Sequence, residues 1–428
     1  MKILFLHQNF PGQYKNLVAE LVRQGGHEIV FLTQHANADA PWVRKIVYKP
    51  PRKATEGVHR YIGELEAAVL NGQAVAQACE GLRSKGFRPD IIVGHNGWGE
   101  TLYVKDVWPS VPLLAYFEFY YKSSGSDVGF ENPERSSLDN AARLRTRNTI
   151  NLLGLEAADA GQCPTRWQFE QFPASVRHKL SIVHEGVDTA YVRPDPNARI
   201  DMVDRGVVLT RRDEVVTYVA RNLEPYRGFH KFMRALPEIQ RRRPNAHVVI
   251  VGGDGVSYGS RLPEGQSYRK NLTEELGSSV DFSRVHFFGH LPYAKFLRIL
   301  QVSSVHVYLT YPFVLSWSML EAMAAGCLVV GSSTPPVVEV LKDGKNGLLA
   351  DFFSPAGIAK RIDEVLSHPN RMQAIREEAR ATILRDFDLK TVCLPKMLSV
   401  MGTLAGGHGT PLQQALPAQR LGVAPSQS

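Results

Sequence analysis

The sequence predicts an α/β protein with two domains, each built around a doubly wound parallel sheet. The chain has 428 residues, which is too long for one ordinary core because domains usually span roughly 100–200 residues. Short, nearly all-apolar runs alternate with longer segments of helical periodicity, as in repeated strand–helix–strand units. The alternation weakens between residues 188 and 213, where Pro194 and Pro196 lie among several charges. We expect the interdomain linker in this stretch.

The first half of the chain, residues 1–195, forms the first predicted domain. A loop and a helix follow the first strand, and the apolar side chains of this helix recur at helical spacing: Tyr14, Leu17, Val18, Leu21 and Val22. Gly25 and Gly26 end the helix. The expected strands are residues 2–7, 27–33, 89–94 and 112–117.

The second predicted domain covers residues 196–385 and repeats the pattern. Its first helix also has one apolar face, made by Phe229, Phe232, Met233, Leu236 and Ile239. The expected strands are residues 215–219, 247–252, 284–288, 305–309 and 328–332. Residues 402–428 are rich in Gly, Pro, Gln, Ala and Ser without periodicity, which predicts a disordered tail.

Composition narrows the class of protein. Hydrophobic residues make up 44% of the chain and charged residues 21%, which is typical of a globular protein. Apolar runs fall far short of the ~18–20 residues that a membrane-spanning helix needs. The apolar start of the chain is too short for a signal peptide and reads as a strand. Four scattered cysteines without a C-x-x-C pair favour neither a disulfide framework nor a zinc site, so we expect a cytoplasmic protein.

The chain is basic, with a formal net charge of +8. Arginines cluster at positions 241–243 and at Arg143, Arg145 and Arg147. This charge suits a nucleic acid, an anionic membrane surface or a phosphate-bearing ligand. Aromatic residues are not interleaved with a basic stripe and no nucleic-acid-binding motif occurs, so we expect no nucleic-acid partner.

Two arginines stand where parallel sheets bind anions. Arg221 follows a buried strand of the second domain, and Arg227 precedes Gly228 and a helix. Two guanidinium groups there could hold a diphosphate through bidentate hydrogen bonds. The alternative is a pair of solvated loop arginines.

A second candidate segment is residues 281–292. Its strand ends at Phe288 and Gly289, and the turn that follows contains Leu291 and Pro292. The glycine permits close approach of a flat ligand, and exposed backbone groups could bind a base edge. The alternative is an ordinary strand-to-helix turn with proline at the helix start.

Residues 311–326 are the densest candidate segment. A helix is expected to start here, and its first amides could bind a phosphate or sugar hydroxyls. Glu321 lies one turn into the helix, where its carboxylate could accept hydrogen bonds from vicinal hydroxyls. The alternative is a capping box, in which Ser318 and Glu321 satisfy only backbone groups.

Taken together, these segments resemble the family 4 retaining glycosyltransferases of the GT-B fold. The resemblance covers roughly residues 183–351, in the family's order and spacing. It rests on Gly186-Val187-Asp188-Thr189, Arg221 with Arg227-Gly228, Gly253-Asp254-Gly255, Phe288-Gly289-x-Leu291-Pro292, Leu320-Glu321-Ala322-Met323-Ala324-x-Gly326 and Asp343-Gly344-x-Asn346-Gly347. The first half resembles the family more loosely, through Phe10-Pro11-Gly12 and Gly26-His27.

The resemblance implies a GT-B architecture, in which two Rossmann-like domains face each other across a cleft, and a final helix at residues 386–401 that crosses back to the first domain. It also implies a role for each donor-binding residue. Arg221 and Arg227 would bind the donor diphosphate, Glu321 the ribose, and the loop from Phe288 to Leu291 the nucleobase. The remaining implied donor contacts are Gly12, Gly253, Ser316, Trp317 and Ser318.

The sequence departs from the family pattern at two positions. Phe313 stands eight residues before Glu321, where the family usually has a carboxylate, and Tyr311 is no carboxylate either. Glu118 stands where many members have a histidine, and His95 is a second candidate for that role. We expect Glu118 and His95 to be the catalytic residues of a divergent subfamily.

The implied reaction moves a sugar from a nucleotide-diphosphate sugar, UDP- or GDP-linked, to a glycan or lipid-linked hydroxyl acceptor. The configuration would be retained, with neither metal nor cofactor, in envelope, exopolysaccharide or lipopolysaccharide synthesis. The D-x-D at Asp386 and Asp388 is placed as a helix boundary rather than a metal site. The surplus positive charge predicts peripheral contact with an anionic membrane.

Two rival functions remain. A Rossmann oxidoreductase needs G-x-G-x-x-G, and the nearest match, residues 252–259, has Tyr258 in place of a glycine. A non-catalytic sugar-nucleotide-binding protein, or a partner-dependent subunit, is compatible with the changes at Phe313 and Glu118.

Overall fold

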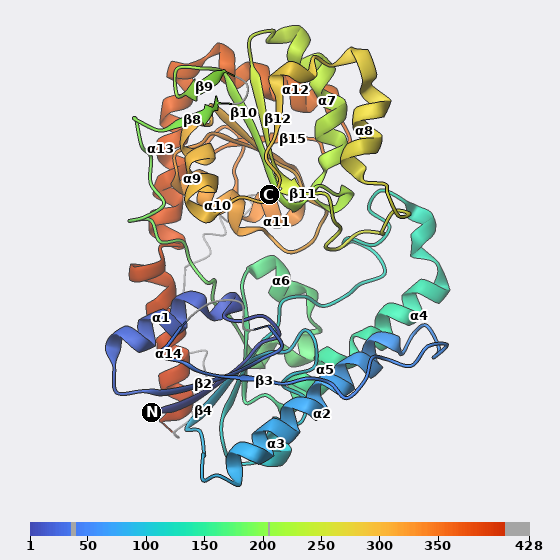
Figure 1. Ribbon diagram of the computed structural model, residues 1–428, viewed down its shortest axis with the longest axis vertical. Helices are drawn as coiled ribbons and strands as arrows, with labels where there is room; N and C mark the ends of the chain where they lie inside the picture. The colour runs from blue at the N-terminus through green and yellow to red at the C-terminus, as the bar shows by residue number, and fades with distance from the viewer. Residues whose placement is uncertain (36–39, 204–205, 407–428) are drawn as a thin grey trace, which may run out of the picture.

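The computed structural model describes residues 1–35, 40–203 and 206–406 and contains two α/β lobes, one above the other in Figure 1. The sheet of the first lobe has seven parallel strands in the order β3-β2-β1-β4-β5-β6-β7. Its strands are β1 (Lys2–Leu6), β2 (Glu28–Thr33), β3 (Arg44–Val47), β4 (Ile91–His95), β5 (Leu113–Tyr116), β6 (Ala160–Cys163) and β7 (Leu180–Ile182). Its helices are α1 (Lys15–Gln24), α2 (Gly63–Arg83), α3 (Val104–Val107), α4 (Leu138–Arg147), α5 (Thr149–Ala157) and α6 (Arg166–Gln171).

The second lobe has a six-stranded parallel sheet in the order β12-β11-β10-β13-β14-β15. Its strands are β10 (Val215–Asn222), β11 (His247–Gly253), β12 (Val285–Phe287), β13 (Val305–Tyr308), β14 (Val329–Ser332) and β15 (Leu348–Ala350). Its helices are α7 (Phe229–Arg242), α8 (Tyr268–Leu276), α9 (Tyr293–Val302), α10 (Trp317–Ala324), α11 (Pro335–Val340), α12 (Pro355–Ser367) and α13 (Pro369–Asp386). The two-domain α/β class is therefore confirmed.

The predicted helix of the second lobe shows how the pattern produces the fold. The apolar face of α7 is at most 1% exposed and packs on the sheet. Gly228 precedes the helix with a φ of +67°, and a Cβ there would lie 2.4 Å from Cβ of Leu309. Only glycine fits this position, and the tight turn brings Arg227 against β13.

The linker prediction is wrong for part of its range. A two-stranded antiparallel hairpin, β8 (Arg199–Met202) and β9 (Val207–Thr210), lies inside residues 188–213. Its inward side chains Ile200, Met202 and Leu209 pack against the second sheet, beside Val249. The strands are short and flanked by charges, so their alternation resembles a polar linker in the sequence.

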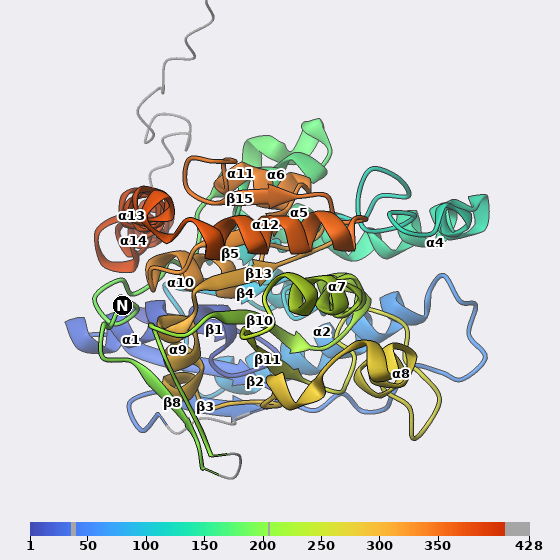
Figure 2. The ribbon, with the colours of Figure 1, turned by 90° about the horizontal axis from the view of Figure 1, so that it is seen from above.

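The last helices that the structure describes, α13 and α14, lead back from the second lobe to the first, along the left side of Figure 1 and of Figure 2. A π-helical turn (Leu389–Cys393) leads into α14 (Leu394–Ala405), whose apolar side chains, such as Met397 and Met401, pack beside Ile3 and Phe5 of β1. The predicted tail is wrong for residues 402–405, because α14 continues through Ala405. Residues 407–428 lie outside the described part of the chain. Within the described ranges, no helix combines the length and apolar character that a membrane crossing requires.

Candidate active site

Glu118 and His95 extend from neighbouring strand ends of the first sheet. His95 is the last residue of β4, and Glu118 lies just beyond β5. Nε2 of His95 lies 3.9 Å from Oε2 of Glu118 and has no hydrogen-bond partner among the described residues. The other ring nitrogen of His95, Nδ1, accepts the backbone N–H of Gly97 at 3.0 Å. The structure therefore brings the two predicted catalytic side chains together.

The surroundings of this pair change its proton chemistry. Burial, reinforced by the charge of Glu185, raises the pKa of Glu118 to about 7, although Arg221, a hydrogen bond from Gln13 and Arg227 act against the rise. Burial lowers the pKa of His95 well below its usual value. At neutral pH the histidine is therefore uncharged, and Glu118 changes its charge in the physiological range. The two side chains are not an ordinary ion pair.

Glu185 is a site residue that sequence reasoning did not identify. It is 3% exposed and follows β7. The phenol of Tyr116 donates to its Oε1, and the indole Nε1 of Trp317 donates to Oε2 at 3.0 Å. A single carboxylate thus joins the floor of the first lobe to the first residue of α10. Its only signal in the sequence is its position directly before the Gly186 motif.

The two arginines differ sharply in environment. Arg227 is 8% exposed, and its NH1 donates to Thr310 Oγ1 at 2.9 Å and to the carbonyl oxygen of Val314 at 2.8 Å. Its guanidinium carbon lies 5.5 Å from the ring centre of Tyr258. Arg221 is exposed. The alternative of two solvated loop arginines is therefore wrong for Arg227, which also fastens the loop that leads to α10.

The start of α10 differs from the capping-box alternative. Ser316, not Ser318, is the N-cap residue, and its Oγ accepts the N–H of Ser318 at 3.4 Å. The N–H of Ser316 donates to the phenol oxygen of Tyr308 at 2.8 Å. Two of the three amides predicted to meet a phosphate therefore have acceptors inside the protein.

Glu321 faces a neighbouring helix rather than the backbone of its own helix. The phenol of Tyr293, at the start of α9, donates to Oε1 of Glu321 at 2.6 Å. Burial raises the pKa of Glu321 to about 7, while this hydrogen bond and the charge of Lys15 act in the opposite direction. Lys15 belongs to the first lobe and lies 5.4 Å from the Tyr293 ring centre. The capping-box alternative is wrong, and the carboxylate lies where both lobes approach.

The predicted glycine contacts lie where the backbone passes close to a side chain, Gly12 in a turn and Gly253 at the end of β11. Gly12 has a φ of +54°, and a Cβ there would lie 2.5 Å from the ring of His7. A Cβ on Gly253 would lie 2.2 Å from Nε2 of His290, in the turn after β12. Phe288 and Leu291 are half-buried against the core beneath that turn. The backbone is therefore close to its neighbours at both glycines.

Phe313 is part of an aromatic wall between the lobes. Its ring centre lies 4.6 Å from that of Phe119 of the first lobe and 5.0 Å from that of Tyr258. Tyr226 stacks on Tyr311 at 4.7 Å in the same wall. Aromatic packing thus occupies the position where the family resemblance implies a carboxylate.

Beside this wall, the 119–131 segment of the first lobe packs onto the second lobe. Glu131 accepts hydrogen bonds from His230 at 2.9 Å, from Lys231 at 2.7 Å and from the phenol of Tyr311. Asp127 accepts one from the phenol of Tyr226 at 2.8 Å. A cavity of about 700 Å³ lies between this segment, α4 and the start of α7. Tyr258 lines the cavity and also contacts Arg227, so the cavity adjoins Arg227.

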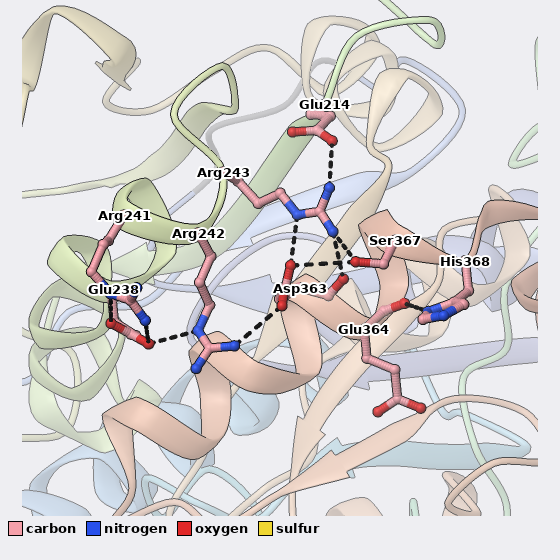
Figure 3. Close-up of polar contacts among 9 residues, drawn as sticks. All are labelled: Glu214, Glu238, Arg241, Arg242, Arg243, Asp363, Glu364, Ser367 and His368. Atoms are coloured by element: carbon pink, nitrogen blue, oxygen red, sulfur yellow. Dashed lines mark hydrogen bonds and ion pairs between the residues drawn. The ribbon is translucent and has the colours of Figure 1, made fainter.

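The arginine cluster at positions 241–243 is not a free basic patch. Arg241 and Arg242 bind Glu238 on their own helix, and Arg243 binds Asp363 of α12 and Glu214 (Figure 3). Most of this positive charge is neutralised inside the lobe.

The Asp386–Asp388 pair lies at a helix boundary, as expected. Asp386 ends α13, and Asp388 accepts the N–H of Thr391 at 2.7 Å. Among the described residues, no group of three or more His, Cys, Asp or Glu side chains is arranged to hold a metal ion.

The two α/β lobes with a candidate site between them are typical of a two-domain transferase. Comparisons with known proteins identify the family. Residues 25–192 match the model of the glycosyl transferase family 4 group, and residues 204–382 match that of glycosyl transferases group 1. The two matches cover one lobe each. The chain belongs to the family 4 glycosyltransferases.

Relatives of known function share its length. A glycogen synthase of Mycobacterium tuberculosis is 27% identical over 425 residues, which cover 92% of each chain. A D-inositol 3-phosphate glycosyltransferase of Corynebacterium jeikeium is 24% identical over 85% of each chain.

Solved structures share the GT-B fold. HepE of Anabaena, crystallised with UDP and glucose, aligns with a TM-score of 0.67 at 18% identity, covering 94% of this chain and all of that one. Sucrose-phosphate synthase of Thermosynechococcus elongatus aligns with a TM-score of 0.70 at 15% identity, covering 95% of this chain and all of that one.

Proposed function

We propose that this glycosyltransferase moves a sugar from a UDP- or GDP-linked donor to a hydroxyl acceptor with retention of configuration, in the synthesis of a cell-envelope or extracellular polysaccharide. The observation that carries the proposal is the contact between the lobes at the candidate site, where Trp317 at the start of α10 donates to Glu185, the carboxylate whose charge helps to raise the pKa of Glu118. The names of relatives support such donors, since one is a GDP-mannose-dependent mannosyltransferase and HepE was crystallised with UDP-glucose.

In the proposed step, the acceptor hydroxyl oxygen bonds to the anomeric carbon while the bond from that carbon to the β-phosphate oxygen breaks. The electron pair leaves on the nucleoside diphosphate, and the hydroxyl proton passes to the departing phosphate. Ionised Glu118 accepts a hydrogen bond from a neighbouring hydroxyl group of the acceptor and so orients the attacking one, and the neutral His95 ring packs beside Glu118. Arg221 and Arg227 stabilise the charge that develops on the leaving phosphate, so the proposed chemistry uses neither metal nor cofactor.

Glu321 would bind the ribose hydroxyls of the donor. Its carboxylate has one phenol partner, Tyr293, which leaves acceptor sites for a diol on the same group. Trp317 at the helix start and the turn from Phe288 to Leu291 would contact the rest of the nucleotide.

A thermal-shift screen against UDP-, GDP-, ADP- and CMP-sugars tests the donor. Stabilisation grows with the logarithm of ligand concentration over Kd, so binders of about 10–100 µM are visible. We expect a UDP- or GDP-sugar to raise the Tm, and Glu321→Ala to remove this shift while the fold persists. Transfer or donor hydrolysis by the purified protein separates an enzyme from a non-catalytic binder. No shift with any nucleotide sugar would contradict the proposal.

We further propose a cytoplasmic location with peripheral contact to an anionic membrane, through edge strand β3. Residues 40–55 contain five cationic and no acidic residues. Trp42 is 75% exposed, and Arg44 and Lys49 are exposed beside it. Binding to vesicles containing phosphatidylglycerol should weaken with salt and fall in Trp42→Ala. Equal binding of the variant, or none by the native chain, would contradict this surface.

A further inference from the structure

Three buried histidines of the first lobe share one local contact. His7 follows β1, His95 ends β4 and His184 lies just beyond β7, so all three stand at the same edge of the parallel sheet. In each, Nδ1 of the ring accepts the backbone N–H of the residue two positions further along, at 2.8, 3.0 and 2.9 Å respectively. Burial lowers the pKa of each ring, for His7 to about 4, so the rings are neutral at physiological pH. A neutral ring whose Nδ1 is an acceptor carries its hydrogen on Nε2, which is therefore a donor.

The Nε2 hydrogen of His7 fixes the direction of one amide group. Nε2 lies 2.6 Å from Oε1 of Gln13, and this carbonyl oxygen can only accept. The amide nitrogen of Gln13 is thereby turned toward Glu118 and donates to Oε1 of that carboxylate at 3.4 Å. Donation therefore runs in one direction, from the backbone N–H of Asn9 through His7 and Gln13 to Glu118.

The histidine that starts this series is held firmly. His7 is 2% exposed, and its ring centre lies 5.4 Å from that of Trp98 and 5.9 Å from that of Tyr14. The backbone at Gly12 passes so close that a Cβ there would lie 2.5 Å from the ring. Gln13 follows directly in the 3₁₀ turn Gly12–Tyr14, which leads into α1. The ring has little room to rotate, so it can hold the Gln13 amide in one orientation.

Gln13 is a neutral donor among the charged and titratable groups that face Glu118. Those groups come from both lobes and are His95, Tyr116, Tyr121, Glu185, Arg221 and Arg227. Burial and the charge of Glu185 raise the pKa of Glu118, whereas the arginines and the hydrogen bond from Gln13 act to lower it. A hydrogen bond donated to a carboxylate favours its ionised form. Loss of the Gln13 amide should therefore favour the protonated form of Glu118.

We propose that Gln13 is a positioning residue for Glu118, and that His7 orients the Gln13 amide through its Nε2 hydrogen. The inference rests on the proposed function, in which ionised Glu118 orients the acceptor. Gln13 holds Oε1 of the carboxylate and leaves Oε2 for a hydroxyl group of the acceptor.

The test is the pH profile of kcat/KM for transfer by the full chain between pH 5 and 9. Gln13→Met keeps the length of the side chain but removes the amide donor, so the decrease of kcat/KM at low pH should move upward by about half a pH unit. Gln13→Glu can keep the bond from His7 but turns a like charge toward Glu118. It should move the decrease upward by about one pH unit, which lowers kcat/KM at pH 6 about tenfold. His7→Phe leaves the amide free to rotate and should act in the same direction as Gln13→Met.

Gln34 provides the matched control. It is a half-buried glutamine that follows β2 at the same edge of the sheet, and its amide nitrogen donates to Oδ1 of Asn71 at 2.8 Å. Gln34→Met should leave the pH profile where it is in the native chain. A side chain with a purely structural role would lower kcat/KM equally at every pH, so a displaced profile identifies an effect on Glu118.

Thermal unfolding separates this inference from the proposed function, because it needs no substrate. The Tm of the native chain should fall below that of Glu118→Gln as Glu118 ionises, and in a Gln13→Met background this difference should level off at higher pH. Such a displacement in a protein without transfer activity would sink the proposed function and keep the role of Gln13. An unchanged profile or Tm difference in Gln13→Met, an equal displacement in Gln34→Met, or a downward movement in Gln13→Glu would overturn the inference. A native profile in His7→Phe would overturn the orienting role of His7.

Discussion

Glu118 and Glu131 are carboxylates of the same lobe whose environments move their pKa in opposite directions. Burial and the charge of Glu185 raise the pKa of Glu118 to about 7. Burial acts in the same sense on Glu131, but hydrogen bonds from His230, Lys231 and Tyr311 outweigh it and lower the pKa to about 2. A carboxyl group with a pKa near 7 can gain or lose a proton during a reaction at neutral pH. One with a strongly lowered pKa stays ionised and can hold a permanent contact.

The pKa of Glu118 predicts the pH dependence of transfer. Because the ionised form orients the acceptor, kcat/KM should fall as pH drops below about 7, tenfold per pH unit. Glu118→Gln should lower kcat/KM by a factor of about 10²–10⁴ and should remove its decrease below pH 7. The measurement is kcat/KM from pH 5 to 9. Glu100→Gln is the matched control, since Glu100 is also buried with a pKa of about 7 but binds Tyr48 away from the arginines. If the decrease of kcat/KM below pH 7 persisted in Glu118→Gln and vanished in Glu100→Gln, the assignment of this pH dependence to Glu118 would be refuted.

Thermal unfolding of the same variant separates loss of function from loss of fold. When the folded state raises the pKa of a carboxyl group, the fold is more stable with that group protonated than with it ionised. The native chain therefore loses stability as the pH rises from about 4.5 to 7 and Glu118 ionises. A glutamine at this position does not ionise and avoids this loss. The Tm of Glu118→Gln should therefore match the native Tm near pH 4.5 and exceed it by a few degrees at pH 8, whereas a misfolded variant would show a lower Tm at both.

At the scale of elements, the sequence predicted most of the sheet strands because they are apolar runs of regular spacing. It missed β3, β6, β7 and β15, which have three or four residues each, and some of them contain polar side chains such as Gln162. The start of α10 agrees with the prediction that Glu321 lies about one turn into a helix, and the N-cap is Ser316 rather than the Ser318 of the capping-box alternative. Both serines satisfy the local pattern, and only Tyr293, from another helix, determines where the Glu321 side chain lies.

The arginine cluster of α7 gives a prediction about helix packing. Arg243 joins α7 to α12 through Asp363, with Oδ1 of that residue 2.7 Å from Nε (Figure 3). Removing it takes the cation from the partly buried Glu214 and leaves Asp363 with Arg242 alone, so Arg243→Ala should lower the free energy of unfolding by about 1–3 kcal/mol. Arg241→Ala is the matched control, because Arg241 is 67% exposed and binds only Glu238 on its own helix. Its effect should stay within about 0.5 kcal/mol. Equal losses in urea unfolding would contradict this role.

At the scale of the molecule, the interface between the lobes could not be predicted from sequence patterns. Glu131 and Tyr311 are 180 residues apart, and the Trp317–Glu185 bond joins positions 132 apart. The periodicity of a single sequence does not reveal contacts between residues so far apart. Each of these four residues also fits a polar loop or an ordinary helix start. The resemblance implied donor residues mainly on the second lobe, whereas the contacts that Glu131 and Glu185 make between the lobes emerged from the structure alone.

The contacts of Glu131 predict a barrier to separation of the lobes. Its side chain is 18% exposed and its partners Lys231 and His230 are 17% and 12% exposed, so these contacts are poorly screened by solvent. Glu131→Ala leaves His230, Lys231 and the phenol of Tyr311 without this acceptor and should shift the closed-to-open equilibrium by about 3 kcal/mol, or about a hundredfold. Small-angle X-ray scattering of the ligand-free variant should give a larger radius of gyration, and a bound donor should restore much of the native value.

The exposed Glu134, three residues further along the first lobe, provides the control, because Glu134→Ala removes a carboxylate of the same region without touching the interface. Since the lowered pKa of Glu131 keeps it ionised, its contribution is present above about pH 4.5 and is lost only as pH falls toward 2. The native radius should thus stay constant from pH 5 to 8. An unchanged radius in Glu131→Ala, or an equal increase in Glu134→Ala, would show that the other contacts between the lobes, such as the aromatic wall around Phe313 and the Trp317–Glu185 bond, suffice to hold them together.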